Sequence, residues 1–202
     1  MSESTTGLRE RKKQQTHVAL AQAGLRLFAE RGYDETTLAE IAEAAGVSTR
    51  TVFAYFGSKE DLLFASVQTM CDTVVEAVTE RPEGVDALTA LRDFIVSSAH
   101  EKDELDQKLS ELIAADPTLA SHKRARISQM QDMIAAELAK DLGVPDDDLR
   151  PHVAAASLVS AFEVLERQDT GVSKPSSADE VAAAVDPIFA FVRAGLDALP
   201  AA

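Results

Sequence analysis

Residues 37 to 56 read TLAEIAEAAGVSTRTVFAYF and contain two short helical patterns with a glycine between them. Thr37 and Glu40 stand at the spacing of a capping box, in which each side chain accepts a hydrogen bond at the start of a helix. Gly46 is suited to end that helix, and Ser48 is suited to cap the next one. Two short helices joined by so tight a turn predict a helix-turn-helix.

The second of these helices has an apolar side and a side suited to DNA. Val52 and Phe56 are four residues apart and are expected to pack, with Val47, against the preceding helices. The outward side carries Thr49, Arg50, Thr51, Phe53 and Tyr55. A recognition helix leads with its N-terminal part into the major groove, so we expect the first three of these residues to contact base edges. An arginine can donate two hydrogen bonds to guanine, and a threonine methyl can touch thymine.

The distribution of charge decides whether an acidic chain can approach DNA. The formal net charge is −14, but residues 1–65 hold eight Lys or Arg and nine Asp or Glu, and the remainder holds twelve and twenty-five. Repulsion therefore acts mainly through the second part, and salt screens it beyond about 8 Å. We expect DNA phosphates to be contacted by Tyr55, Lys59 and the N-terminus of the first of these helices at Thr37.

The rest of the sequence predicts an all-α fold of about nine helices, because Ala, Leu, Glu, Gln and Arg recur at helical spacing without alternating β-branched runs. One helix is expected over 11–31, before the helix-turn-helix, and another from Ser58 to about Glu80. Breaks at Pro117 and Gly143 separate later helices. These are expected at about 85–101, 103–115, 118–142, 147–168 and 178–199.

Composition favours a protein of the cytoplasm. The N-terminus is polar and then basic and has no apolar core segment, so we expect no secretory signal. The near-apolar run 153–162 is too short to span a bilayer, so we expect no membrane association. The single cysteine, Cys71, fits a reducing compartment, and we expect a packed thiol there, with redox sensing as the alternative.

Residues 9–64 resemble the N-terminal domain of the TetR family of transcriptional regulators, through LRLFAERGYDETTLAEIAEAAGVS and TRTVFAYFGSKEDLL. The resemblance implies DNA contacts by Thr37, Thr49, Arg50, Thr51, Phe53, Tyr55 and Lys59, and we include Ser48 with them. Phe53 departs from the tyrosine of many members and removes a hydroxyl donor. The basic cluster 9–13, with Arg11 and Lys12, looks like the family's N-terminal arm that contacts DNA, and a solvated tail is the alternative.

The same resemblance implies a bacterial regulator that is dimeric and responds to a ligand, most often a repressor bound to a palindromic DNA operator. We expect DNA binding in residues 1–57, a linking helix over 58–80, and a ligand-binding and dimerisation domain over 58–202. The effector is expected to be a small apolar or aromatic molecule. An adaptor that binds another protein through Phe53 and Tyr55 is the alternative. With no acid–base pair or phosphate loop evident, we expect no enzyme, no cofactor and no metal site.

Two sets of residues beyond position 69 carry further expectations. We expect six residues to line an adaptable effector pocket, with a plain role in the hydrophobic core as the alternative. They are Met70, Phe94, Met130, Met133, Leu158 and Phe162. The last two helices carry apolar stripes that could form a four-helix bundle between two protomers, or complete the core of one. For the dimer interface we expect Leu158, Ala161, Leu165, Ile188, Val192 and Leu196.

Overall fold

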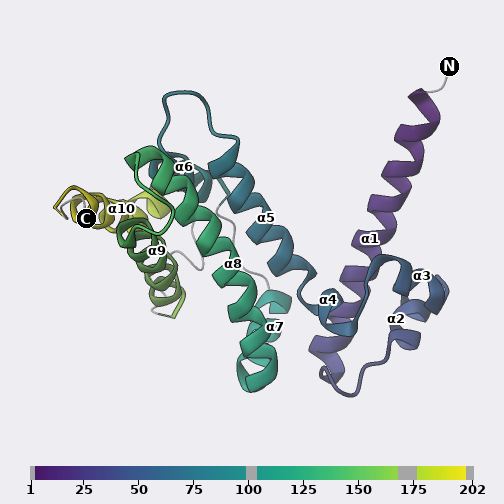
Figure 1. Ribbon diagram of the computed structural model, residues 1–202. Helices are drawn as coiled ribbons and strands as arrows, with labels where there is room; N and C mark the ends of the chain where they lie inside the picture. The colour runs from purple at the N-terminus through teal and green to yellow at the C-terminus, as the bar shows by residue number, and fades with distance from the viewer. Residues whose placement is uncertain (1–2, 99–103, 168–176, 199–202) are drawn as a thin grey trace. The chain divides into compact units, whose positions relative to one another are not determined.

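The computed structural model describes residues 3–98, 104–167 and 177–198, and in these residues helices are the only regular secondary structure, as the all-α prediction expected (Figure 1). Its ten helices are α1 (Glu3–Arg31), α2 (Leu38–Ala44), α3 (Thr49–Tyr55), α4 (Lys59–Leu63), α5 (Ala65–Thr79), α6 (Ala87–Ser98), α7 (Glu104–Ala115), α8 (Pro117–Leu142), α9 (Leu149–Arg167) and α10 (Ala178–Ala198). The expected helix ends at 101, 103, 168 and 199 lie outside the described residues. No described helix is long and apolar enough to cross a membrane.

Local capping fixes the ends of the short helices, as the sequence predicted. Thr37 caps α2 in a complete capping box with Glu40, and the side chain of Ser48 caps α3 by accepting from the amide of Thr51. Gly46 has φ 67° in the turn between the two helices. This left-handed conformation strains any residue with a Cβ atom, which explains the glycine at this turn.

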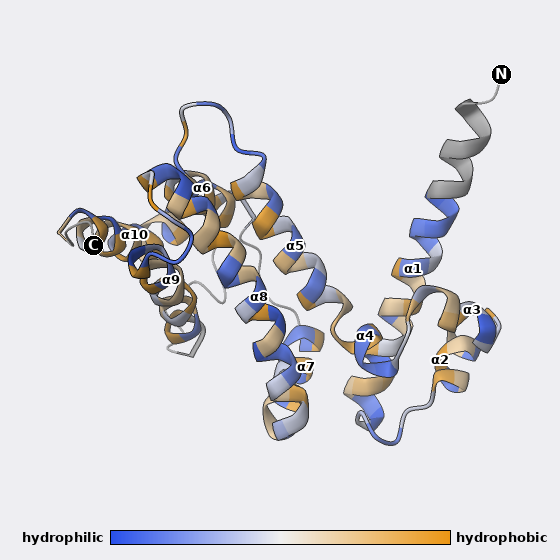
Figure 2. Cartoon of the chain, in the orientation of Figure 1, coloured by the Kyte–Doolittle hydropathy of each residue, from blue (hydrophilic) through white to orange (hydrophobic). Residues whose placement is uncertain are grey.

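Two expectations about helix limits were wrong. The helix predicted from Ser58 to Glu80 is two helices, α4 and α5, because the backbone at Phe64 leaves helical geometry (φ −93°, ψ 9°) while its side chain is fully buried. The first helix, predicted to start at residue 11, already begins at Glu3, so Arg11 and Lys12 of the basic cluster lie on α1; the role of this cluster as a DNA-contacting arm remains a prediction. Residues 11–15 are exposed and hydrophilic along this part of the helix (Figure 2).

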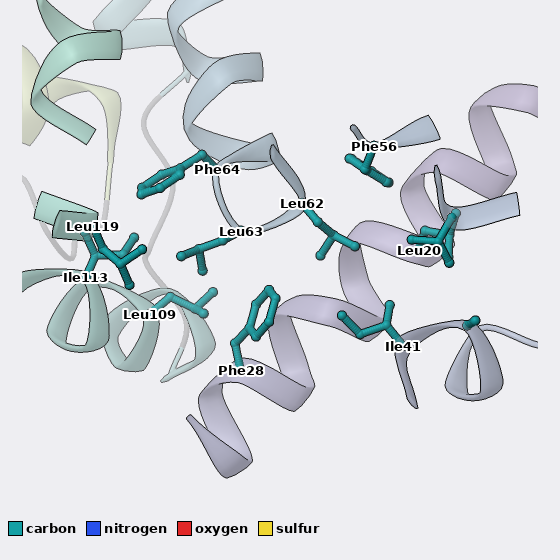
Figure 3. Packing of buried hydrophobic residues seen from close by; sticks show 12 residues of the cluster. Leu20, Phe28, Ile41, Phe56, Leu62, Leu63, Phe64, Leu109, Ile113 and Leu119 are labelled. Atoms are coloured by element: carbon teal, nitrogen blue, oxygen red, sulfur yellow. The ribbon is translucent and has the colours of Figure 1, made fainter. Parts of the chain in front are cut away.

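Contacts divide the chain into two compact units, which we describe separately. The first contains α1 to α4, the start of α5 as far as Gln68, α7, and α8 as far as Lys123. Its core joins Phe28 of α1 and Leu62 of α4 with Leu109 and Ile113 of α7 (Figure 3). The sequence did not indicate that α7 packs with the DNA-binding helices.

The second unit contains the remainder of α5 and α8 together with α6, α9 and α10. The helix α10 packs against α6 and α9, and one of its sides is buried. Near the end of α5, Arg81 donates to Glu137 and Asp141 of α8, each at 2.6 Å. The Arg81 side chain is only 13% exposed, and its pKa is raised chiefly by the hydrogen bond to Glu137. This ion pair therefore ties the end of α5 to α8.

Packing of α1 against α4 leads to a stability prediction at Gly24. A Cβ atom on this buried glycine would lie 2.0 Å from Cδ2 of Leu62, which is itself fully buried. Gly24→Ala should lower the free energy of unfolding by roughly 1–3 kcal/mol because the core must accommodate an extra methyl group. Thermal unfolding followed by circular dichroism measures this effect.

The matched control is Gly195→Ala, because Gly195 also lies inside a helix but a Cβ atom there has no neighbour within 4 Å. This substitution should leave stability unchanged or raise it by about 0.5–1 kcal/mol through helix propensity. If both variants were equally stable, the proposed close packing at Gly24 would be excluded.

Candidate DNA-binding site

The helix-turn-helix is held by a buried inner side. Val52 of α3 is fully buried and Phe56, at the C-cap of α3, is 4% exposed. Both belong to the same core as Leu20 of α1 and Ile41 of α2. The turn is closed by a hydrogen bond of 2.9 Å from the Val47 amide to the Ala42 carbonyl. The predicted inner side of α3 is thus confirmed.

Burial of this inner side leaves Thr49, Arg50, Phe53 and Ala54 exposed on α3. Residues three and four positions apart lie on one face of a helix, so Phe53 shares a face with Arg50 and with Thr49. Phe53 is 57% exposed, which is unusual for so large an apolar side chain. Neither Thr49 nor Arg50 is hydrogen-bonded through its side chain to another described residue, so both side chains are available to a ligand.

Ser48 and Thr51 are engaged in holding the start of α3. The Ser48 hydroxyl accepts from the Thr51 amide at 3.1 Å, and the two hydroxyl groups lie 2.8 Å apart. Tyr55 is half-buried beside His17 of α1, with ring centroids 6.3 Å apart. The roles of these three residues at DNA remain predictions, but their positions are set by contacts within the protein.

At the start of α2, Thr37 already has an acidic partner. Its amide and its hydroxyl both donate to Oε2 of Glu40 at 2.8 Å, and the first of these bonds is the main reason that the pKa of Glu40 is lowered. Arg31 lies 3.0 Å from the other Glu40 oxygen and is 52% exposed. A phosphate near Thr37 would therefore meet a carboxylate, and Arg31 is the cation beside it. Arg31 was not among the residues predicted to contact DNA, and its only signal in the sequence is its place in the last turn of α1.

Lys59 points toward the protein backbone. Its ammonium donates to the carbonyl oxygens of Tyr33 at 2.8 Å and Thr36 at 3.1 Å, with that of Asp34 at 3.5 Å. It also lies 4.2 Å from the centre of the Tyr33 ring. Burial, followed by the charge of Glu60, raises the pKa of Tyr33 to about 12. The ammonium therefore binds the loop between α1 and α2.

The residues expected to line a pocket all lie in the second unit but differ in exposure. Met130 and Leu158 are buried, Phe94 and Phe162 are half-buried, and the other two, Met70 and Met133, are exposed. Two shallow hollows are formed by described residues, one along α1 from Arg11 to Gln22 and one around Arg81. Neither hollow is lined by any of these six residues, so their role as a pocket remains a prediction.

The expected dimer residues also differ in exposure. Leu158, Val192 and Leu196 are buried within the protomer, while Ala161, Leu165 and Ile188 are half-buried. The large apolar residues that remain exposed on α9 and α10 are Leu149, Val153, Val164 and Phe191. The apolar stripes expected to meet a second protomer thus contribute largely to the core of the second unit, and a different set faces outward.

A capped helix-turn-helix with an exposed arginine on its second helix, followed by a separate helical unit, defines a class of DNA-binding regulators. Residues 20–66 match the profile described as bacterial regulatory proteins, tetR family, and residues 83–197 match the MftR C-terminal domain. The regulator TcmR of Streptomyces glaucescens is 30% identical over 172 residues, which cover 80% of this chain and 76% of the relative.

Solved structures share the fold. GusR of Salmonella enterica has a TM-score of 0.62 and 21% identity over 91% of this chain and 96% of its own. A complex of SmeT with triclosan has a TM-score of 0.60 and 22% identity over 90% and 91%. SmeT is the repressor of the multidrug efflux pump SmeDEF of Stenotrophomonas maltophilia. The chain belongs to the tetR family of bacterial regulatory proteins and is a helix-turn-helix DNA-binding regulator of transcription.

The contacts at the start of α3 predict different effects for two neighbouring hydroxyl residues. Ser48→Ala removes the N-cap and should lower the free energy of unfolding by about 1 kcal/mol. Thr49→Ala, on the exposed side, should change it by less than about 0.5 kcal/mol. Urea denaturation of the two variants measures both effects. Equal losses would mean that the capping role is not specific to Ser48.

Proposed function

We propose that this protein is a homodimeric repressor that binds a palindromic operator through α3 and is released from DNA by a small molecule, in the bacterial cytoplasm. The observation that carries the proposal is the exposed surface of α3, which includes Arg50 and Phe53, whereas Val52 of the same helix is buried. A solvated helix seldom exposes a phenylalanine, and this one is joined by an arginine without a partner among the described side chains. Family membership supports DNA as the ligand of this face.

Base reading would use one polar and one apolar contact. Arg50 can donate two hydrogen bonds to O6 and N7 of a guanine. Phe53 lies three residues further on, which is about 4.5 Å along the helix axis. The thymine methyl is the apolar group that the major groove presents, so we assign it to Phe53. We therefore expect a guanine and a thymine within about two base pairs of each other in each half-site.

Phosphate binding would use cations around the helix-turn-helix. Arg11 and Lys12 are exposed on α1, and Arg31 is exposed beside the start of α2. Contacts of this kind orient a protein on the duplex without reading its sequence. Because each one releases counterions, they make affinity fall steeply with salt.

Dimerisation would use the outward faces of α9 and α10. Phe191 is 74% exposed on α10, and Leu149, Val153 and Val164 are exposed on α9. Burying these side chains against a second copy is favourable at about 25 cal/mol per Å² of apolar surface. A twofold axis would then present two copies of α3 to two half-sites, which explains why we expect a palindrome.

Release would follow from ligand binding in the second unit. We assign residues 1–57 to DNA binding, residues 58–202 to the effector and the dimer, and residues 58–80 to the link. The six predicted pocket residues are all apolar, and SmeT, which shares the fold, has been solved in complex with triclosan, which supports an apolar or aromatic effector. Such a ligand shifts the regulator only as far as it binds the two conformations with different affinity.

Fluorescence anisotropy of the purified protein on DNA duplexes that cover the region upstream of its own gene tests the proposed function. In parallel, binding sites are selected from DNA of random sequence. The expected result is saturable binding to one palindromic duplex. The logarithm of the association constant should fall linearly with the logarithm of the salt concentration. Binding no tighter than to random DNA in both experiments would exclude it and favour an adaptor. Once an operator is known, release by candidate compounds tests the effector.

Base reading by Arg50 leads to a prediction about specificity. Arg50→Ala should cost about 1–3 kcal/mol on the operator and remove the preference for guanine at one position of each half-site. The control Arg11→Ala should weaken binding to all duplexes alike and reduce the salt slope by about 0.9. Competition with single-base operator variants measures both. Equal losses on operator and random DNA for Arg50→Ala would remove it from base reading.

The proposed dimer face leads to a prediction about assembly. Phe191→Glu places a charge where apolar surface should be buried and should weaken the dimer by at least about 2 kcal/mol, or roughly thirtyfold. Sedimentation velocity over a concentration series measures this shift. The control Phe53→Glu changes an exposed phenylalanine of α3 and should leave the dimer intact. A Phe191→Glu variant that dimerises as tightly as wild type would exclude this face.

A further inference from the structure

We propose that Phe53 reads a C5-methyl group in the major groove and not a whole base, so that methylation of a cytosine at that operator position strengthens binding. Thymine and 5-methylcytosine carry this methyl group at the same place on the pyrimidine ring. The inference rests on the proposed function, because it concerns how α3 recognises its DNA. It goes further in that it makes the chemical modification of the operator a second input to the regulator, beside the effector.

The side chain of Phe53 has no polar atom with which to read a base edge. Donors and acceptors distinguish the base pairs in the major groove, and phenylalanine can bond to none of them. The apolar group that the groove presents is the methyl group at C5 of thymine. Cytosine has a hydrogen atom at that position, and 5-methylcytosine has the methyl group again. An apolar contact therefore separates methylated from unmethylated pyrimidines, whichever base carries the methyl group.

The packing of α3 keeps Phe53 available for such a contact. Val52 is fully buried, which fixes the rotation of the helix, while Phe53 is 57% exposed and Ala54 beside it is exposed as well. Thr49 lies four residues earlier on the same face and is also exposed. Its side chain carries a methyl group of its own, so it is the neighbour from which the contact of Phe53 must be distinguished.

The groove that α3 enters decides what an exposed phenylalanine can touch. Apolar side chains that wedge between base steps do so from the minor groove. A helix-turn-helix places its second helix, here α3, in the major groove, where the methyl groups lie. Because Phe53 shares a face with Arg50, the methylated pyrimidine is expected close to the guanine that Arg50 binds.

An apolar contact also has its own dependence on salt. Contacts with phosphates release counterions, so their contribution weakens as the salt concentration rises. Burial of a methyl group against Phe53 releases none. Its contribution should be about fourfold in affinity for each half-site, from the transfer free energy of one group of this size. The preference for a methylated pyrimidine should therefore stay constant while the overall affinity falls.

The experiment uses the full chain and the palindromic duplex obtained by selection from random sequence. Each thymine of the half-site is replaced in turn, in both halves, by deoxyuridine, which removes only the methyl group. At the position that responds, cytosine and 5-methylcytosine are then compared, each opposite guanine. Fluorescence anisotropy gives the affinities at several salt concentrations.

Four proteins are compared in this experiment: the wild type, Phe53→Ala, Phe53→Leu and Thr49→Ser. Phe53→Ala removes the proposed contact, whereas Phe53→Leu retains an apolar side chain of intermediate size. Thr49→Ser is the matched control, because it removes one methyl group from the same exposed face and keeps the hydroxyl group. Since both positions are exposed, the four proteins should have similar melting temperatures.

For the wild type we expect one thymine position in each half-site at which deoxyuridine lowers affinity, by roughly fifteenfold for both halves together. 5-Methylcytosine should bind more tightly than cytosine there by a similar factor, at every salt concentration. Phe53→Leu should keep both preferences and Phe53→Ala should lose them, while Thr49→Ser should behave as the wild type.

Three outcomes would overturn the proposal. A wild-type protein that is indifferent to deoxyuridine at every position would have no methyl contact. A preference that survives in Phe53→Ala would belong to Thr49, if Thr49→Ser removes it, or to the shape of the duplex. Equal affinity for cytosine and 5-methylcytosine would mean that thymine is read as a base. If selection yields no palindrome, the proposed function itself fails, whereas a palindrome bound without any methyl preference refutes this inference alone.

Discussion

The orientation of α3 depends on the burial of Val52 and Phe56 against α1 and α2. A helix of seven residues has too few hydrogen bonds to be stable alone, so its position comes from these side chains. One residue corresponds to about 100° of rotation, and a turn of that size would bring Phe53 toward the core and Val52 toward solvent. The same contact thus selects Arg50 and Phe53 as the face that can reach DNA.

This core extends beyond the first four helices. Leu109 and Ile113 of α7 and Leu119 of α8 complete it together with Phe64, so the packing around α3 includes segments from the second half of the sequence (Figure 3). Residues of α8 belong to both compact units, which gives the proposed ligand site a covalent connection to this core.

Sequence patterns predicted the structure correctly where side chains within a few residues determine it. They did not predict it where the determining contact comes from a residue distant in sequence. The caps at Thr37 and Ser48 and the turn at Gly46 follow from side chains within a few residues. Helical spacing also identified Val52 and Phe56 as inward. It could not show that Lys59 meets carbonyls more than twenty residues away, or that α7 joins the first core. On α10 it showed an apolar stripe, but burial of Val192 and exposure of Phe191 depend on which neighbouring helices cover each side.

For the proposed regulator, the acidic second part of the chain has a physical consequence for specificity. Non-specific binding to DNA is almost entirely an interaction of cations with phosphates, whereas base reading depends on contacts such as those assigned to Arg50 and Phe53. A net charge of −14 opposes all DNA alike and therefore lowers non-specific affinity, while the base contacts are retained only at the operator. Since screening restricts the repulsion to about 8 Å at physiological salt, it need not prevent the exposed face of α3 from entering the groove. An acidic chain is thus compatible with DNA recognition and favours a regulator that spends little time on other sequences.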